Sequence, residues 1–255
     1  MNRRKININS VPKKMSVRYQ NKDLYLPDEL KKELDHYWAN LIKSGKKFTR
    51  GNVYAIKDIV MNSEKLNIHL EKTDYAHYLY SREFPLSEEN VCKEIHSAAM
   101  IKTSDEKMFF GEMSPNTAHP NRLQFVGGGI DLSDIKGGLV DFKHSLVREA
   151  KEEVGLDLLD ETITETIFPK YIKTGGLYHV IAIIYEVKLK IDSQKFEELY
   201  NDFIDLLKEA GEEPEFVNLH SVSVNLESIN DFFNNEKRAM VDYIEPVFRE
   251  EVDNK

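Results

Sequence analysis

Three glutamates close together in the sequence have the spacing of a cation site. Glu149, Glu152 and Glu153 occupy positions i, i+3 and i+4, so on a helix their side chains share one face. Like charges at these spacings repel one another by about 0.2–0.5 kcal/mol per pair. A hard cation such as Mg2+ prefers oxygen ligands and would turn this repulsion into binding. A solvated acidic helix face is the plainer alternative, because such faces are common.

The residues around these glutamates favour the cation site. Arg148 precedes them, and Gly155 follows at the point where a left-handed residue ends a helix. Upstream, the consecutive glycines Gly127, Gly128 and Gly129 follow a short apolar run. A glycine has no Cβ, so the backbone there can approach a metal or a phosphate closely. This combination is more specific than the acidic spacing alone.

The segment from Arg148 to Leu156 resembles the second half of the Nudix box, the signature of hydrolases that cleave nucleoside diphosphates linked to another group. The family pattern is Arg-Glu, an aliphatic residue, any residue, Glu-Glu, any residue, Gly and an aliphatic residue. The matching positions here are Arg148, Glu149, Glu152, Glu153, Gly155 and Leu156. Ala150 at the first aliphatic position is a mild departure.

The loop before this helix departs further from the family pattern. Asp134 stands where the first Gly belongs, and Val140 replaces the early Glu. The glycine run lies farther upstream than usual, so we infer an insertion over residues 132–138. Asp141 is a residue type that caps a helix N-terminus, and Ser145 fits the small-residue position of the helix. The register of the helix is therefore kept while the loop is altered.

The resemblance implies a reaction and a set of roles. The reaction is Mg2+-dependent hydrolysis, with Mn2+ as an alternative ion, of the diphosphate linkage in a nucleoside diphosphate joined to a sugar or an ADP-ribose-like moiety. The partner is then a small nucleotide derivative. The implied roles are metal binding for Glu149, Glu152 and Glu153, orientation of these glutamates by hydrogen bonds from Arg148, and substrate binding at Gly127, Gly128 and Gly129.

Family members often use a further acid from a later loop. Glu212, Glu213 and Glu215 are the candidates here, with a solvated acidic turn as the alternative for each. Tyr178 and His179 begin an apolar segment, where they either face the substrate or lie in the core or at its rim.

Two other functions stay open on the same fold. The departure at Val140 favours a non-catalytic nucleotide-sensing or regulatory module, whereas the three helix glutamates favour the enzyme. An isomerase acting on isopentenyl diphosphate would need a catalytic cysteine near the glycines. Cys92, the single cysteine, is poorly placed for that role.

The pattern of elements predicts an α+β fold, and the resemblance implies a Nudix α/β/α sandwich with a mixed sheet. We expect a small α+β N-terminal accessory region in residues 1–90 and the Nudix hydrolase domain in residues 91–255. An apolar stripe predicts a first helix over 27–44, and alternation predicts strands over 53–61 and 66–70. The second region is predicted to have strands at 97–102, 107–112, 124–126, 165–171, 177–189 and 216–224, and helices at 142–154, 196–210 and within 229–248. The strand at 177–189 is almost wholly apolar and is therefore expected to be central.

Two short N-terminal motifs carry a fainter likeness. Residues 48–51 (Phe-Thr-Arg-Gly) and 73–75 (Thr-Asp-Tyr) are similar to the leader region of Nudix diphosphatases that act on UDP-sugars. An ordinary small leader that packs on the catalytic region is the alternative.

Composition excludes several classes of protein. The 255 residues carry a net charge of -9, which argues against an extended nucleic-acid surface. No apolar run reaches the ~18 residues of a membrane span. The N-terminus lacks the apolar region of a secretory signal and Cys92 cannot form an internal disulfide, so a cytoplasmic protein is expected. The basic start, residues 3–14, is expected to be a solvated tail. Many Nudix enzymes dimerise, so a homodimer through the N-terminal segment is an open alternative.

Overall fold

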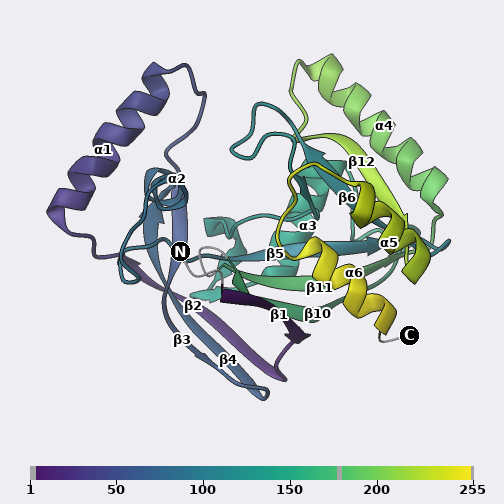
Figure 1. The fold of residues 1–255 in the computed structure, drawn as a ribbon, viewed down its shortest axis with the longest axis horizontal. Coiled ribbons are helices and arrows are strands. Elements are labelled where there is room, and N and C mark those ends of the chain that lie inside the picture. Colours follow the sequence, from purple (N-terminus) through teal and green to yellow (C-terminus); the bar gives the residue numbers. More distant parts are fainter. Residues whose placement is uncertain (1–3, 177–179, 254–255) are drawn as a thin grey trace.

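The computed structural model describes residues 4–176 and 180–253, and its main body is a mixed sheet with helices on both faces (Figure 1). The strand order is β1 (Arg4–Ser10), β10 (Thr164–Gly176), β11 (Ile181–Leu189), β5 (Ile95–Lys102), β6 (Lys107–Met113) and β12 (Phe216–Ser223), with β7 (Leu123–Gln124) beside β6. β11 and β5 run parallel, and the other pairs run antiparallel. As predicted, the apolar strand β11 lies inside the sheet rather than at its edge.

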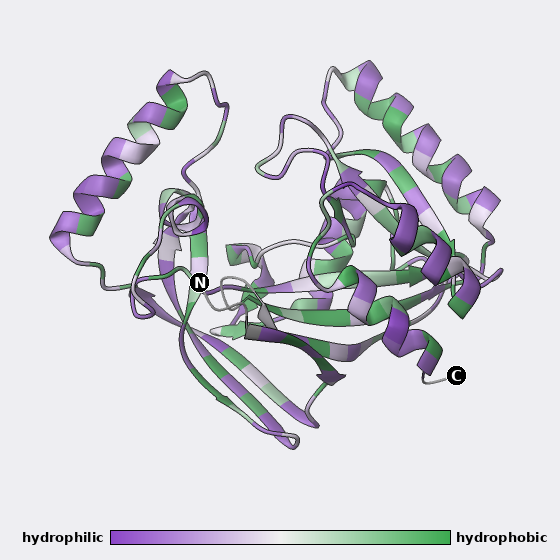
Figure 2. Cartoon of the chain, in the orientation of Figure 1, coloured by the Kyte–Doolittle hydropathy of each residue, from purple (hydrophilic) through white to green (hydrophobic). Residues whose placement is uncertain are grey.

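Helices cover the two faces of this sheet because its central strands are apolar on both sides (Figure 2). On β5, Ala99 and Ile101 pack with the face that holds α3 (Phe142–Val154) and α4 (Ser193–Ala210). Ala98 and Met100 pack with the face that holds α5 (Leu226–Asn235) and α6 (Ile244–Asp253). This alternation confirms the predicted α+β sandwich.

A second, smaller sheet lies beside the sandwich (Figure 1). Its order is β3 (Asn52–Met61), β4 (Lys65–Asp74), β2 (Lys14–Asp23), β9 (Leu139–Val140) and β8 (Ile135–Lys136). The predicted first helix is α1 (Asp28–Lys43), which follows Pro27 and buries Leu30 and Leu34 against neighbours that include Tyr80 of α2 (Tyr75–Glu83). Cys92 is fully buried just after this region, and its backbone N–H donates to Ser81 Oγ (3.0 Å).

The basic start of the chain is not a solvated tail in the described residues from Arg4 onward, so that prediction was wrong. β1 pairs with β10 at the edge of the large sheet, and β2 pairs in parallel with β4 in the small sheet. The sequence did not predict these two strands because their side chains are largely polar. A strand at the edge of a sheet, or with one face open to solvent, tolerates charged side chains.

Residues 132–138, where the sequence predicts an insertion, also have a structural role. They form a short 3-10 turn, η1 (Leu132–Asp134), and strand β8, which pairs with β9. β9 in turn pairs with β2 of the first part of the chain. Strands therefore cross the predicted division near residue 90 in both directions: β1 enters the large sheet, and β8 and β9 enter the small one. The division itself stays a prediction.

Helix α3 has the ends that its sequence predicts. The Asp141 side chain accepts a hydrogen bond from His144 N (3.0 Å), which satisfies one free N–H of the first turn. Gly155 ends the helix in the left-handed region at φ 68°. Ala150, at the aliphatic position of the box, is fully buried against the sheet. In the part of the chain that the structure describes, no helix is long and apolar enough to cross a membrane.

Candidate active site

The three glutamates of α3 lie at different depths. Glu153 is almost completely buried (1% exposed) and Glu149 is buried near the surface, whereas the Glu152 side chain is 57% exposed. The helix spacing therefore brings all three to one side of α3, as the sequence indicates, but only two of them lie in the protein interior.

The glycine run packs directly on the two buried carboxylates. Gly127 N donates a hydrogen bond to Glu153 Oε2 (2.7 Å). A Cβ on Gly128 would lie 2.4 Å from Glu149 Oε1, and one on Gly127 would lie 2.2 Å from the carbonyl oxygen of Ser97. Gly127 also has φ 141°, which favours glycine. Gly129 has open space around it. Gly127 and Gly128 must therefore be glycines, because a side chain at either position would clash with β5 or with Glu149 of α3.

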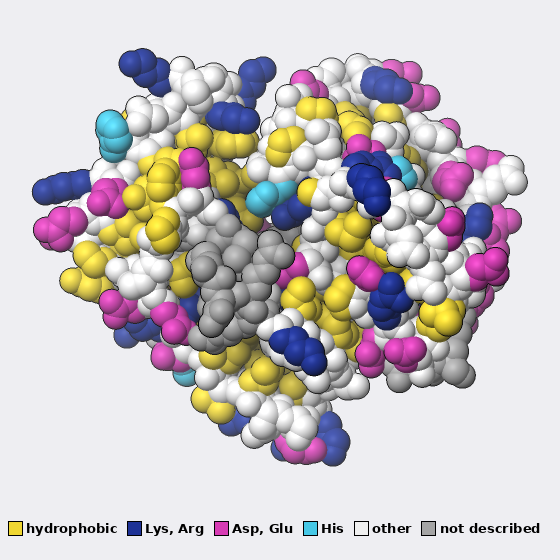
Figure 3. Space-filling view, in the orientation of Figure 1, with side chains coloured by type: hydrophobic (Ala, Val, Ile, Leu, Met, Phe, Trp, Pro, Cys, Tyr) yellow, Lys and Arg dark blue, Asp and Glu magenta, His cyan; other side chains and the backbone are white. Residues whose placement is uncertain are grey.

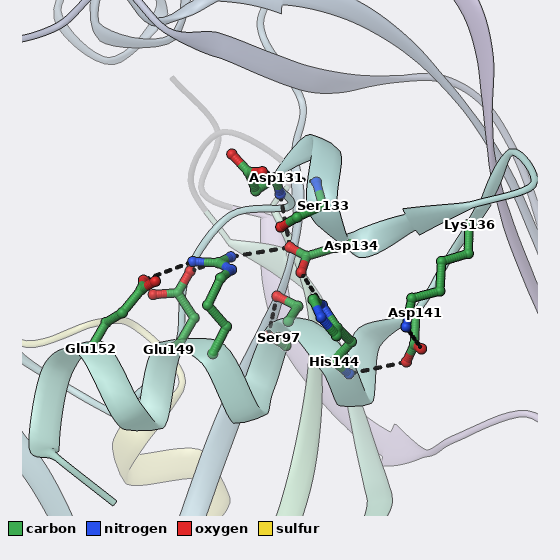
Figure 4. A network of polar contacts seen from close by, with 11 residues as sticks. Ser97, Asp131, Ser133, Asp134, Lys136, Asp141, His144, Glu149 and Glu152 are labelled. Carbon is green, nitrogen blue, oxygen red and sulfur yellow. Dashed lines mark hydrogen bonds and ion pairs between the residues drawn. The ribbon is translucent and has the colours of Figure 1, made fainter. Parts of the chain in front are cut away.

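Arg148 links two of the glutamates to a buried aspartate. Figure 4 labels these three partners, Glu149, Glu152 and Asp134. Its guanidinium contacts Glu149 Oε1 (2.9 Å, from Nη2) and Glu152 Oε2 (2.9 Å, from Nη1). Nη2 also donates to Asp134 Oδ2 (3.0 Å). Asp134 is fully buried and pairs through Oδ1 with His144 Nδ1 (2.9 Å). Arg148 therefore has the geometry of the orienting role that the resemblance implies, although that role itself stays a prediction.

Sequence reasoning treated Asp134 only as a departure from the family glycine. Burial raises the pKa of this carboxyl, but hydrogen bonds from Arg148, Asp131 N and His144 outweigh it and hold the pKa below its usual range. Asp134 is thus a charged anchor for Arg148. The sequence held one sign of this ion pair: a carboxylate stands at a position where glycine is expected, upstream of an arginine that needs an acidic partner.

The acidic side chains raise one another's pKa. Burial, together with Glu215 and Glu152, raises the pKa of Glu149 to about 7, although Arg148 opposes the shift. Burial raises the pKa of Glu153 well above its usual range, and Glu215 and Glu149 add to the effect. These shifts describe a crowded negative site that a bound cation would relieve.

One of the later acids joins this cluster. Glu215 lies in the wall of a cavity, and its side chain is exposed to solvent. Nearby protein atoms nevertheless remove part of its hydration, and this desolvation raises the pKa of its carboxyl group. Glu213 lines the same cavity and accepts a hydrogen bond from Asn116 Nδ2 (2.6 Å). Glu212 is exposed and is not among the residues that line the cavity. Tyr178 and His179 lie outside the described residues.

The cavity has a volume of about 890 Å³ and lies between the glycine run and the N-terminal region. Its acidic wall is formed by Glu149, Glu215 and the three glycines. Its aromatic wall includes Phe48 and the stacked rings of Tyr75 and Tyr78, whose centroids are 5.4 Å apart. Phe48 meets Tyr75 edge-on at 5.9 Å. Sequence reasoning did not predict this aromatic wall as a site.

The two N-terminal motifs meet beside this cavity. Arg50 pairs with Asp74 (2.8 Å) and with Asp35 (2.7 Å), and Tyr75 N donates to Gly51 O (3.0 Å). These contacts hold the segment after α1 against the start of α2, so the rings of both motifs reach one wall. An aromatic wall of this kind can stack on a planar group.

The donor chemistry of the acidic wall suits a hard cation, because carboxylate oxygens are the ligands that Mg2+ and Mn2+ accept. The carboxylates are nevertheless engaged with the protein: Arg148 contacts Glu149 and Glu152, and Gly127 N holds Glu153. Within residues 4–176 and 180–253, no three acidic, histidine or cysteine side chains already converge on one point. The glutamates fit the ion by type and by charge, and binding requires Glu149 or Glu152 to exchange its contact with Arg148 for the metal.

Comparison with known proteins gives structural likeness only. No protein-family model matches the sequence, and no curated protein matches it. By its fold, the chain is similar to Nudix hydrolases of solved structure. One is the MutT protein from Methanosarcina mazei Go1 (17% identity, 62% of this chain and 92% of that chain, TM-score 0.36). Another is a mutant of the Bacillus subtilis pyrophosphohydrolase BsRppH (12% identity, 67% of this chain and 85% of that chain, TM-score 0.38). A third is the Nudix hydrolase RenU from M. smegmatis (11% identity, 62% of this chain and 83% of that chain, TM-score 0.35).

These likenesses are distant, so the resemblance to the Nudix box rests on the residues of α3 and the glycine run. The segment that resembles the second half of the box has a capped helix that carries the three glutamates. In the first half, the position of the early glutamate is held by Val140 of β9, whose side chain packs on the core.

Proposed function

We propose that the chain is a metal-dependent hydrolase, with Mg2+ or Mn2+ as the ion, that cleaves the diphosphate linkage of a nucleoside diphosphate joined to another moiety. One observation carries the proposal: buried carboxylates crowd against a glycine run at the edge of a cavity of about 890 Å³. That volume is within the range of sites for drug-sized ligands. A nucleoside diphosphate derivative therefore has room to place its phosphates at the acidic wall and its base on the aromatic wall.

The side chains supply positioning and proton transfer. A bound divalent cation would neutralise the diphosphate and lower the pKa of the attacking water. Arg148, anchored by Asp134, holds Glu149 and Glu152 on one side of α3. Two carboxylates that line the cavity, Glu149 and Glu215, are placed to accept the proton of the water.

The test is turnover with and without Mg2+ on a panel of ADP-ribose, UDP-glucose, diadenosine polyphosphates and NADH. We expect metal-dependent cleavage of one class of substrate at its diphosphate linkage, with water added so that each of the two products ends in a phosphate group. Glu153→Gln should reduce kcat by about 100-fold or more, the range of losses when charge stabilisation is removed from an active site. Glu197→Gln, on the exposed face of α4, is the matched control and should leave turnover unchanged. Near-normal turnover of Glu153→Gln would refute the metal assignment.

A nucleotide-sensing module is the second candidate. The contacts that occupy Glu149, Glu152 and Glu153, together with Val140 in the box, favour it. A sensor would bind one of the nucleotides of the panel without cleaving it. The isomerase alternative has little support: Cys92 is fully buried, and burial raises the pKa of its thiol.

A further inference from the structure

Another part of the cavity wall is basic. Arg82, Arg122 and Lys173 line it, and two of these three cations have a carboxylate partner. Arg82 pairs with Glu94 (3.2 Å), and Lys173 pairs with Asp242 (3.1 Å). We call these three cations the basic pocket.

Arg122 has no carboxylate within ion-pair distance among the described residues. Its Nη2 donates to the neutral amide oxygen of Gln124 (2.6 Å). Its Nε is buried and has no hydrogen-bond partner in that part of the chain. Arg122 is only partly buried, but its Nε has lost water without gaining a hydrogen bond, and such an unused buried donor is costly.

The surrounding groups leave the basic pocket with an excess of positive charge. Burial and the nearby cations lower the pKa of His96 to about 3 and that of His119 to about 4, so both rings are neutral at pH 7. His119 Nε2 lies 3.4 Å from Tyr78 Oη, so this pair places further polar groups beside Arg122. Histidine and basic side chains are visible in the hollow between the two lobes (Figure 3).

We propose that the basic pocket binds a phosphate group of the substrate that is separate from the diphosphate being cleaved. This rests on the proposed function and narrows its substrate to a nucleoside diphosphate derivative that carries an additional phosphomonoester. The guanidinium of Arg122 presents several donors in a planar fork, which suits phosphate oxygens. The scissile diphosphate belongs at the acidic wall, where a cation would bind, so the two anionic groups would occupy different parts of one cavity.

The first experiment needs neither metal nor turnover. Inorganic phosphate is titrated into the full chain in EDTA, and binding is followed by calorimetry. We expect saturable binding that Arg122→Gln weakens about tenfold or more, as the loss of a charge-assisted hydrogen bond implies. Arg249→Gln, an arginine of α6 paired with Glu245, is the matched control and should bind like the wild type.

Three results would overturn the proposal: no phosphate binding to the wild type, unchanged binding by Arg122→Gln, or acetate binding as tight as that of phosphate. Arg122→Lys keeps the charge without the fork and should give intermediate affinity. A thermal melt of each variant shows whether it folds. If Arg122→Gln does not fold, Arg122→Lys decides the question alone.

The second experiment compares two substrates that differ by one phosphomonoester on the ribose. We expect the wild type to prefer the phosphorylated substrate about tenfold in kcat/KM, mainly through KM, and Arg122→Gln to lose that preference. Equal kcat/KM values for the pair in the wild type would overturn the proposal. Loss of all hydrolysis with phosphate binding intact would count against the proposed function alone, and the first experiment keeps the two failures apart.

Discussion

At the scale of single residues, Asp134 stabilises the arrangement of the candidate site. It is fully buried, and it holds Arg148 at 3.0 Å and His144 at 2.9 Å. Arg148 in turn contacts Glu149 and Glu152. Through Arg148, Asp134 therefore helps to position the carboxylates of Glu149 and Glu152, which it does not contact itself.

Asp134→Asn should keep the volume of the side chain and lose its charge. We expect a loss of about 1–3 kcal/mol in the free energy of unfolding, the range for a buried hydrogen bond with a charged partner, measured by urea denaturation. Asp131→Asn is the control, because Asn caps a turn as well as Asp does. Equal stability of the two variants would contradict the anchoring role.

His96 should make the protein sensitive to acid. Burial, Lys173 and Arg122 lower its pKa to about 3 in the folded state, below the ordinary value of 6.5. Between these values only the unfolded chain takes up the proton, so stability falls as the pH drops below about 6.5, by at most ~1.4 kcal/mol per pH unit. Unfolding free energies at pH 7.0 and 5.5 measure this. His96→Gln should flatten the dependence, and an unchanged slope would show that other groups cause it.

Residue types identified the acidic wall of the site from sequence but not its aromatic wall. Glu149 and Glu153 share a helix with Arg148, so spacing alone places them together. Arg122, Lys173 and Tyr75 come from segments far apart in the chain, and only the sheet pairing brings them to one cavity. No local pattern could predict that meeting.

At the scale of elements, helix α6 is held to the sheet by a buried set of alternating charges. Lys102 Nζ contacts Glu186 (2.8 Å) and Glu251 of α6. Lys170 Nζ lies 2.7 Å from each of the same two glutamates. Two cations and two carboxylates from β5, β10, β11 and α6 thus neutralise one another.

Lys102→Met should unbalance this set and leave two carboxylates with one cation. Breaking a buried ion pair from one side costs about 3–5 kcal/mol, and here Lys170 should reduce the loss toward the lower value. Denaturant unfolding gives the magnitude, and hydrogen exchange should show faster opening of α6. Lys188→Met is the control, because Lys188 lies 3.8 Å from Glu186 and is 48% exposed. Similar losses in both variants would argue against the network.

Sequence patterns predicted the long elements and missed the short or polar ones. The apolar stripes of α1 and α3 and the continuous apolar run of β11 are strong signals. β1 and β2 alternate weakly and carry charge, and β8 and β9 are two residues each, too short to show a period. These four strands join the two sheets, so the connection between the regions was missed with them.

At the scale of the whole molecule, each of the two sheets contains strands from both sides of residue 90. β1 belongs to the large sheet, and in the small sheet β2 pairs with β9, which pairs with β8. We therefore expect one cooperative unfolding transition, with the calorimetric enthalpy equal to the van't Hoff enthalpy. Scanning calorimetry of the full chain measures both. Two resolved transitions would mean that residues 1–90 and 91–255 unfold as separate units.

Cys92 has a practical consequence. Its thiol is fully enclosed and protonated well above neutral pH, and it is the single cysteine of the chain. A thiol reagent can reach it only when the surrounding structure opens, so the rate of its modification reports that opening. A cysteine introduced on the outer surface would react first and alone. The native sequence is thus already suited to carrying one fluorophore or spin label, and no residue has to be removed beforehand.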